Sequence, residues 1–265
     1  MALIGVEALS EEFGERAAEW ARQWGVPVWI ESRSPRVPGP GVKVVVGELG
    51  LGLAFAEAHR AKPYYVDFLT GRWRARIKQG LGRSHPLRRA LGSREGALHV
   101  IDATAGFGQD SLTLAFMGCE VTALERSPVV AALLKDGLDR AYGESVELRE
   151  VLGRIQVVQA EALAYLPKIA AREGPARPDV IYMDPMFVKP KTSAKSPKEM
   201  QLLQELLGSP AVDEDLRLLE VGLETARARV VVKRPLKGKA VRPGPVHSYK
   251  GQSIRYDVYL RPRES

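Results

Sequence analysis

Apolar residues recur along this chain at the two spacings that helices and strands require. Four of them follow the helical spacing near the N-terminus: Phe13, Ala17, Trp20 and Trp24. Gly25 then stands where such a helix would end. The runs VPVWIE and VKVVVGE, separated by a loop rich in proline and glycine, predict two strands. The N-terminal part therefore predicts a small α/β arrangement.

A regular alternation of strand and helix patterns begins at Leu98. Short apolar runs predict successive strands: LHVIDA, EVTALE, IQVVQA, DVIYMD and RVVVKRP, with SIRYDVYL after them. Helical patterns separate the first five, and the longest of these has Pro128 near its first turn and Gly143 at its expected end. This alternation predicts a doubly wound, mostly parallel sheet covered by helices on both faces.

The change of pattern predicts two domains. We expect a small N-terminal α/β domain with a basic connector over residues 1–95, and a larger α/β domain over residues 96–265. In the first, YYVDFL is expected as a strand, and GRWRARIKQGLGRSHPLRRALG as a basic helical connector. The sequence contains no internal repeat.

Composition is that of an ordinary globular protein, with 45% hydrophobic and 27% charged residues among 265. No apolar run is long enough for a membrane span, and the first residues lack the cationic start of a secretion signal. A single cysteine, Cys119, excludes an internal disulfide framework. A reducing cytoplasm is the expected location.

Positive charge is segregated along the chain, which carries a formal net charge of +7. Basic residues dominate residues 62–94, where Asp67 is the one acid, and residues 227–263, where Asp257 is the one acid. Such segregation is the electrostatic footprint of a nucleic-acid binder. A merely solvated basic face would give the same pattern, so charge alone leaves both interpretations open.

Ligands of doubly wound sheets bind beyond the carboxyl ends of the strands. The first of these ends carries DATAGFGQD, in which Gly106 and Gly108 let a ligand approach the backbone closely, although a tight turn alone would also use them. The G-x-G-x-x-G spacing is missing, which disfavours a nicotinamide-dependent oxidoreductase. Asp102 and Asp110 flank the loop and suit a ligand with an ammonium or sulfonium charge.

Polar residues also follow the second and third predicted strands. Glu125, followed by Arg126, is placed to accept hydrogen bonds from both hydroxyls of a ribose, or else belongs to the start of the next helix. Glu161 and Ala162 are candidates to border an adenine ring, although this segment alone favours a surface helix start. These candidates complete a nucleoside site.

The fourth strand ends in DPMF, which spans Asp184, Pro185, Met186 and Phe187. An Asp-Pro pair alone is more often only a turn. A glycine loop, then an acid, then an acid-proline-x-aromatic is the order found in class I S-adenosylmethionine (SAM)-dependent methyltransferases. DPMF resembles their signature for methylating exocyclic amines of bases or a glutamine amide, with Met186 departing from proline.

The resemblance extends to one family. VIDATAGFGQDSLTLAFMGCEVTALERSPVVAALLKDGLDRA, YMDPMF and RVVVKRP closely resemble the bacterial 16S ribosomal RNA guanine-N2 methyltransferases of the J type, and YYVDFLTG is similar to their leader. The likeness runs from about Tyr64 onward. It implies a class I, Rossmann-like methyltransferase fold, SAM as cofactor with S-adenosylhomocysteine as product, and 16S rRNA or the small ribosomal subunit as partner.

The resemblance implies cofactor contacts by position: Gln109, Asp110, Glu125, Arg126, Glu161, Ala162 and Asp184. Together with Asp102, Gly106 and Gly108 they form the expected cofactor site. Gln109 replaces the arginine usual in the family, and Glu161 with Ala162 replaces small hydroxyl residues.

The implied chemistry places three residues at the target base. Asp184 accepts one N–H of the guanine amine, the carbonyl of Pro185 accepts the other, and Phe187 stacks on the base. Further basic residues are expected on RNA phosphates: Arg72, Arg74, Arg76, Lys78, Lys189, Lys191, Lys233 and Arg234.

Other chemistries find less support. The four histidines show no metal-ligand spacing, and a sulfonium leaving group needs no metal, so no metal is expected. No obligate protein partner is indicated. Two alternatives stay open: methylation of another exocyclic amine, such as adenine N6 in DNA or RNA, and a non-catalytic RNA-binding module on the same fold.

Overall fold

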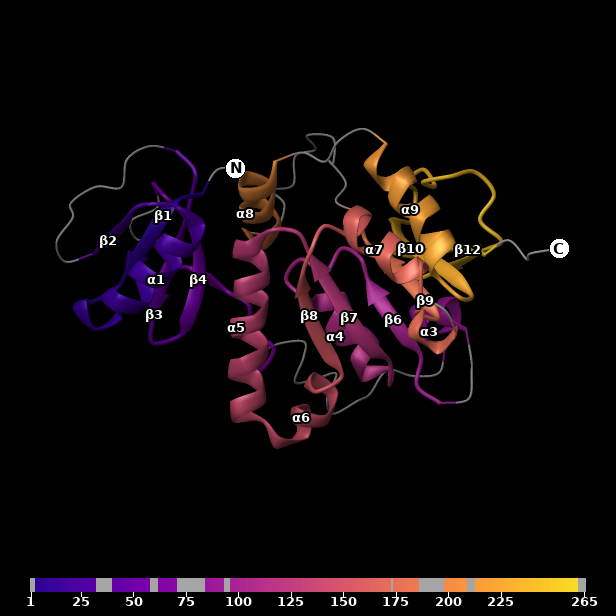
Figure 1. Cartoon of the computed structure of the whole chain (residues 1–265), viewed down its shortest axis with the longest axis horizontal. Coiled ribbons are helices and arrows are strands. Elements are labelled where there is room, and N and C mark those ends of the chain that lie inside the picture. The colour runs from indigo at the N-terminus through magenta and orange to yellow at the C-terminus, as the bar shows by residue number, and fades with distance from the viewer. Residues whose placement is uncertain are drawn as a thin grey trace. The chain divides into compact units, whose positions relative to one another are not determined.

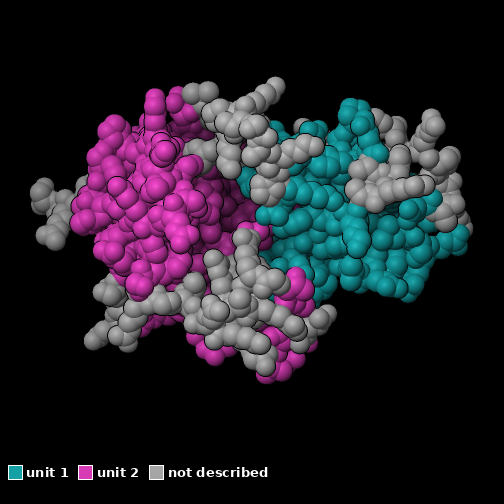
Figure 2. Space-filling model, turned by 180° about the vertical axis from the view of Figure 1, so that it is seen from behind, with its two compact units in different colours: residues 1–68, 132–140, 187–210 teal, residues 69–131, 141–186, 211–265 magenta. Residues whose placement is uncertain are grey.

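The computed structural model describes residues 3–31, 40–57, 62–70, 84–92, 96–172, 174–185, 198–208 and 213–261. The chain forms two compact units, shown in different colours in Figure 2. Unit 1 comprises residues 1–68, 132–140 and 187–210, and unit 2 comprises residues 69–131, 141–186 and 211–265. The domain boundary expected at residue 95 stays a prediction.

Unit 1 is built on a five-stranded sheet in the order β2-β1-β3-β4-β5. Its strands are β1 (Leu3–Ala8), β2 (Val28–Ile30), β3 (Val42–Gly47), β4 (Gly50–Phe55) and β5 (Tyr64–Tyr65). β1 pairs in parallel with β2 and β3, whereas the β3–β4 and β4–β5 pairs are antiparallel. Every residue of β3 is buried, including Lys43, whose Nζ lies 2.8 Å from Oε2 of Glu7.

The first helical prediction is confirmed by α1 (Gly14–Trp24), which follows a short 3-10 turn, η1 (Glu11–Phe13). Gly25 ends α1 in the left-handed conformation, with φ of 65°. Unit 1 also contains α8 (Lys198–Leu207), which packs against β3 and β4. The predicted small α/β arrangement is therefore present.

Unit 2 contains a seven-stranded sheet in the order β11-β12-β10-β9-β6-β7-β8. Its strands are β6 (His99–Asp102), β7 (Glu120–Glu125), β8 (Ile155–Gln159), β9 (Val180–Met183), β10 (Arg229–Pro235), β11 (His247–Lys250) and β12 (Ile254–Leu260). The five strands from β10 to β8 in this order run parallel, whereas β12 is antiparallel to β10 and to β11. The predicted mostly parallel sheet is confirmed.

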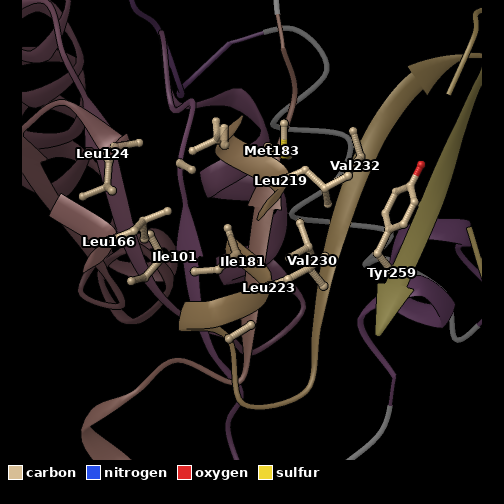
Figure 3. Close-up of a cluster of buried hydrophobic side chains, with 14 of the residues drawn as sticks. Ile101, Leu124, Leu166, Ile181, Met183, Leu219, Leu223, Val230, Val232 and Tyr259 are labelled. Atoms are coloured by element: carbon tan, nitrogen blue, oxygen red, sulfur yellow. The ribbon is translucent and has the colours of Figure 1, made fainter. Parts of the chain in front are cut away.

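Helices cover both faces of this sheet, as the strand patterns predict. On one face, α7 (Ala162–Ala170) and α9 (Glu214–Thr225) bury a cluster that includes Ile101 and Ile181 (Figure 3). On the other, α3 (Pro86–Leu91) and α4 (Gln109–Phe116) cover their sequence neighbours Val100 and Val180. Successive residues of a strand point to opposite faces, so both faces need apolar residues.

Helix α5 (Pro128–Glu144) begins with Ser127 as its cap, whose hydroxyl accepts the N–H of Val130 at 3.4 Å. It is followed by α6 (Val146–Leu152), and a 3-10 turn, η2 (Gly174–Ala176), precedes β9. The helix runs one residue beyond Gly143. Among the described residues, none of the helices is long and apolar enough to cross a membrane.

The strand order creates a switch point between β6 and β9. The chain proceeds from β6 outward through β7 to β8, then returns to pair β9 with the other edge of β6 (Figure 1). Ligands of such sheets bind outside the carboxyl ends of the strands at a switch point of this kind. The carboxyl ends of β6, β7, β9 and β10 all meet at this edge.

Candidate active site

Asp102, the last residue of β6, holds the loop that follows this strand and is only 1% exposed. Its carboxylate accepts the N–H of Thr104 at 3.1 Å and the hydroxyl of Ser111 at 2.6 Å. Burial raises the pKa of Asp102 to about 7. The side chain thus shapes the loop, and its direct contact with a cofactor stays a prediction.

The glycine loop has an open side at Gly106. Gly106 and Gly108 both have positive φ, 54° and 75°, a conformation that favours glycine. Among the described residues, a Cβ on Gly106 would have no neighbour closer than the carbonyl oxygen of Thr104, at 4.0 Å. The described residues thus leave this side of the loop open.

Glu125 ends β7 and fastens this loop. Its Oε2 accepts the N–H of Gly106 at 3.0 Å, and its Oε1 accepts the N–H of Ser127 at 2.7 Å. Burial raises the pKa of Glu125, while the two backbone donors oppose that rise. An ionised carboxylate offers about four acceptor positions, so positions remain for ligand hydroxyls.

Asp184, directly after β9, and Lys233, near the end of the neighbouring β10, lie side by side. Met183 and Val232, the residues before them, are paired in the register of β9 and β10 and are labelled in Figure 3. The Nζ of Lys233 lies 2.8 Å from Oδ2 of Asp184. It also lies 2.7 Å from Oδ2 of Asp110, near the start of α4. One ammonium group therefore bridges two carboxylates.

Further hydrogen bonds fix this group. Tyr182, fully buried in β9, donates its hydroxyl to Oδ2 of Asp110 at 2.7 Å. The backbone N–H of Asp184 donates to Oγ1 of Thr104 at 2.7 Å. The three side chains of the bridge keep partial access to solvent, with 35% of Asp184, 22% of Asp110 and 21% of Lys233 exposed.

The charges of the bridge shift one another's pKa values. Burial raises the pKa of Asp184 to about 6, and Lys233 opposes the rise while Asp110 adds to it. Burial alone would lower the pKa of Lys233, but the two carboxylates outweigh it and raise that pKa. Lys233 therefore stays a cation, and Asp184 is mostly ionised at neutral pH.

The end of β8 leads into α7 through Glu161, whose side chain is 42% exposed. Arg126 lies 3.9 Å from Glu161 and 2.7 Å from Glu214. Ala162 is buried at the start of α7. Residues predicted at the ends of β6, β7, β8 and β9 thus belong to one unit and to one edge of its sheet.

Comparison with known proteins identifies the family. Residues 36–261 match the family described as "Putative SAM-dependent methyltransferase". The chain is 40% identical over 260 residues to the ribosomal RNA small subunit methyltransferase J of Thioalkalivibrio sulfidiphilus, a match covering 97% of each chain. This chain belongs to the ribosomal RNA small subunit methyltransferase J family. It is an enzyme, a SAM-dependent methyltransferase with the class I fold predicted for it.

Two further relatives of the enzyme agree. The methyltransferase J of Stutzerimonas stutzeri is 37% identical over 268 residues, covering 98% of this chain and 96% of the relative. The crystal structure of a SAM-dependent methyltransferase from Neisseria gonorrhoeae has a TM-score of 0.71 and 28% identity, covering 98% of this chain and 97% of that one. The likeness spans both units.

The residues of this methyltransferase fit its cofactor. The open side of Gly106 admits a ligand against the backbone, and Glu125 keeps acceptor positions for hydroxyl groups. The carboxylates of Asp110 and Asp184, only one of which Lys233 balances, leave a net negative charge at the same edge, as a cationic sulfonium group favours.

Several predicted residues of the enzyme lie outside the described part of the chain. They are Phe187, Lys189, Lys191, Arg72, Arg74, Arg76 and Lys78, together with Met186. Lys233 and Arg234 are described, and both have acidic partners: Lys233 in the bridge, and Arg234, 7% exposed, 3.7 Å from Asp215. Their contact with phosphate stays a prediction, and it would compete with these carboxylates.

Sequence reasoning missed the residues that support the site. Thr104 and Ser111 carry hydroxyls beside the glycine loop, and their small polar side chains next to the predicted ligand loop were the available signal. Tyr182 was read only as a strand residue. In the part of the chain that the structure describes, no group of three or more histidine, cysteine or acidic residues is arranged for a metal ion.

Proposed function

We propose that this enzyme methylates the exocyclic N2 amine of a specific guanosine in small-subunit ribosomal RNA. The observation that carries the proposal is the position of Asp184 and Pro185 at the switch-point edge, next to the open glycine loop. The names of the relatives support the RNA substrate, since they refer to the ribosomal small subunit. Such a substrate supports a cytoplasmic location for the enzyme.

Several side chains would hold the cofactor, which supplies a methyl group on a sulfonium centre when bound. Glu125 would accept hydrogen bonds from the ribose hydroxyls with the acceptor positions that Gly106 and Ser127 leave free. The backbone at Gly106 would lie against the ligand. We assign the adenine edge to Glu161 and Ala162, and the remaining contacts to Gln109 and Asp110.

The guanine amine is a poor nucleophile because its lone pair is delocalised into the ring. Asp184 would accept one of its N–H groups and the Pro185 carbonyl the other, which orients the nitrogen. Positioning of two reactants contributes about 7–11 kcal/mol in favourable cases. The amine must release a proton, and Asp184, with a pKa raised to about 6, is suited to take it.

Base and backbone contacts complete the proposal. Phe187 would stack on the extruded guanine, a contact worth about 1–3 kcal/mol. RNA phosphates would meet the predicted cations other than Lys233, and to these we add Lys237 and Lys239. Both are exposed in the segment that follows β10. We expect binding to weaken steeply with salt because these contacts are electrostatic.

A substrate comparison tests the proposal. The enzyme is incubated with radiolabelled SAM and, separately, naked small-subunit rRNA, assembled small subunits and DNA. We expect label in one or both rRNA substrates and none in DNA. Label in DNA would support the adenine alternative, and calorimetric binding of SAM without transfer to any substrate would support a non-catalytic role.

A further inference from the structure

The bridge formed by Lys233 is unlike a surface lysine awaiting phosphate. Its ammonium group contacts Oδ2 of Asp184 at 2.8 Å and Oδ2 of Asp110 at 2.7 Å, and its side chain is 21% exposed. The same Asp110 oxygen accepts the Tyr182 hydroxyl at 2.7 Å. Lys233 is therefore held by partners on two other elements, α4 and the end of β9.

We propose that Lys233 is the positioning residue of the catalytic carboxylate: it holds Asp184 through Oδ2, leaves Oδ1 for the substrate amine, and joins Asp184 to Asp110. This inference rests on the proposed function, in which Asp184 contacts the amine. Lys233 acts through Asp184 and makes no contact with reacting atoms.

The geometry fixes Asp184 at two points. Its backbone N–H is held by Oγ1 of Thr104 at 2.7 Å, and its side chain by Lys233. A carboxylate fixed at one oxygen and at its backbone has few rotamers left, so its second oxygen keeps one direction. Lys233 itself is directed by β10, whose register with β9 pairs Val232 with Met183.

Among the described residues, four ionisable groups interact with Asp184 from the surrounding elements: Lys233 on β10, Asp110 on α4, Tyr182 on β9 and Asp102 on β6. Lys233 lowers the pKa of Asp184, whereas Asp110 raises it. Without the ammonium group, two carboxylates would share a partly buried site with no cation between them. Asp184 would then take up a proton near neutral pH and lose the charge that attracts the amine.

Lys233 and Asp110 thus have opposite effects on the pKa of Asp184, and the experiment compares variants of these two residues. Lys233→Gln removes the stabilising cation, so the pKa of Asp184 is expected to rise. Asp110→Asn removes the competing carboxylate, so the same pKa is expected to fall. If Lys233 and Asp110 had only a structural role, the two substitutions would not shift the pKa of Asp184 in opposite directions.

The test uses the full chain and two readouts. The first follows the Asp184 carboxyl carbon by NMR during a pH titration, with its signal assigned from Asp184→Asn. The second measures methyl transfer to the small-subunit rRNA substrate at saturating SAM between about pH 5 and about pH 9. Lys135→Gln serves as the matched control, because Lys135 forms an exposed pair with Asp139 at 2.8 Å.

We expect Lys233→Gln to shift both the titration and the acid limb of the rate upward by about one pH unit or more. We also expect it to lower kcat at neutral pH by about tenfold or more, with KM for RNA little changed. Asp110→Asn should shift the titration downward, Lys233→Arg should retain a wild-type titration in large part, and Lys135→Gln should match wild type throughout.

An unchanged Asp184 titration in Lys233→Gln would overturn the inference. So would a variant that changes only KM for RNA and the salt dependence of binding, since that result makes Lys233 a phosphate contact. If Lys233→Gln does not fold, the downward shift in Asp110→Asn and the titration of Lys233→Arg decide the question. A wild type that titrates as expected but transfers no methyl group would count against the proposed function alone.

Discussion

The carboxylate of Glu125 accepts the backbone N–H of Gly106 at 3.0 Å. This bond joins the end of β7 to the loop that follows β6, two neighbouring strands of the sheet. The residue predicted to bind ribose therefore also fixes the loop predicted to pass along the cofactor. We therefore expect both the shape of the loop and the affinity for the cofactor to depend on the side chain of Glu125.

Replacing Glu125 should weaken cofactor binding. In Glu125→Gln the amide nitrogen cannot accept from Gly106 or Ser127, so one backbone N–H loses its partner. We expect the Kd for SAM, measured by calorimetry, to rise by about tenfold or more. Glu120→Gln, at the exposed opposite end of the same strand, is the control. Wild-type affinity in Glu125→Gln would refute this role.

Asp184→Asn should separate binding from chemistry. The amide keeps the size of the side chain but carries no charge and cannot take a proton from the amine. We expect kcat for methyl transfer to fall by about 100-fold or more, with the Kd for SAM changed by only a few-fold. Asp139→Asn, at an exposed position, should leave both values unchanged. Transfer at the wild-type rate by a folded Asp184→Asn protein would be incompatible with the mechanism.

The pH dependence of the free energy of unfolding should reflect the raised pKa of Asp102. Its pKa is raised from 3.8 to about 7 by burial. A raised carboxyl pKa contributes stability that is present below about pH 4 and is lost as the pH rises through about 7. Asp102→Asn does not titrate, so the free energy of unfolding of wild type should fall relative to this variant by on the order of 1–3 kcal/mol between about pH 4 and about pH 8.

Chemical denaturation at several pH values measures this difference. The absolute stability of Asp102→Asn is less informative, because the amide also alters the hydrogen bonds to Thr104 and Ser111. A difference that stays constant over the pH range would show that Asp102 does not titrate in this window.

Two glycines of α5 should respond to alanine in opposite ways. A Cβ on Gly137 would lie 2.6 Å from the carbonyl oxygen of Val66, both in unit 1, whereas a Cβ on Gly143 meets nothing within 4 Å. We expect Gly137→Ala to destabilise the protein by about 1–3 kcal/mol. Gly143→Ala should be neutral or stabilising by up to about 1 kcal/mol. Thermal unfolding of the pair measures both, and equal effects would contradict the packing seen here.

The parallel core of the fold was predictable because four of its strands, β6, β7, β9 and β10, are mostly buried. β7 and β10 are apolar runs with clear ends, and their observed bounds match the predicted segments. β1 and β4 were missed because Gly5 and Gly52 interrupt their apolar patterns. β11 and α6 were missed because each is short, and β11 pairs only with β12 along the described part of its sheet.

The candidate site was predictable where its residues follow strands in a fixed order, as Asp184 and Glu125 do. The role of Lys233 was not, because its partners Asp110 and Asp184 are 123 and 49 residues away in the chain. The spacing of residues within a short segment cannot indicate contacts between residues so far apart in the chain. A lysine near the end of a strand in a basic region predicts a phosphate contact, and only the fold reveals the two carboxylates beside it.

The most direct test of the central claim is the identity of the methylated nucleoside. Small-subunit rRNA from a strain lacking this enzyme is incubated, as naked RNA and as assembled subunits, with SAM and the purified protein, then digested and analysed by mass spectrometry. Our account predicts N2-methylguanosine at a single position with wild type and none with Asp184→Asn. Methylation of adenine, or no methylated nucleoside from a protein that binds SAM, would contradict it.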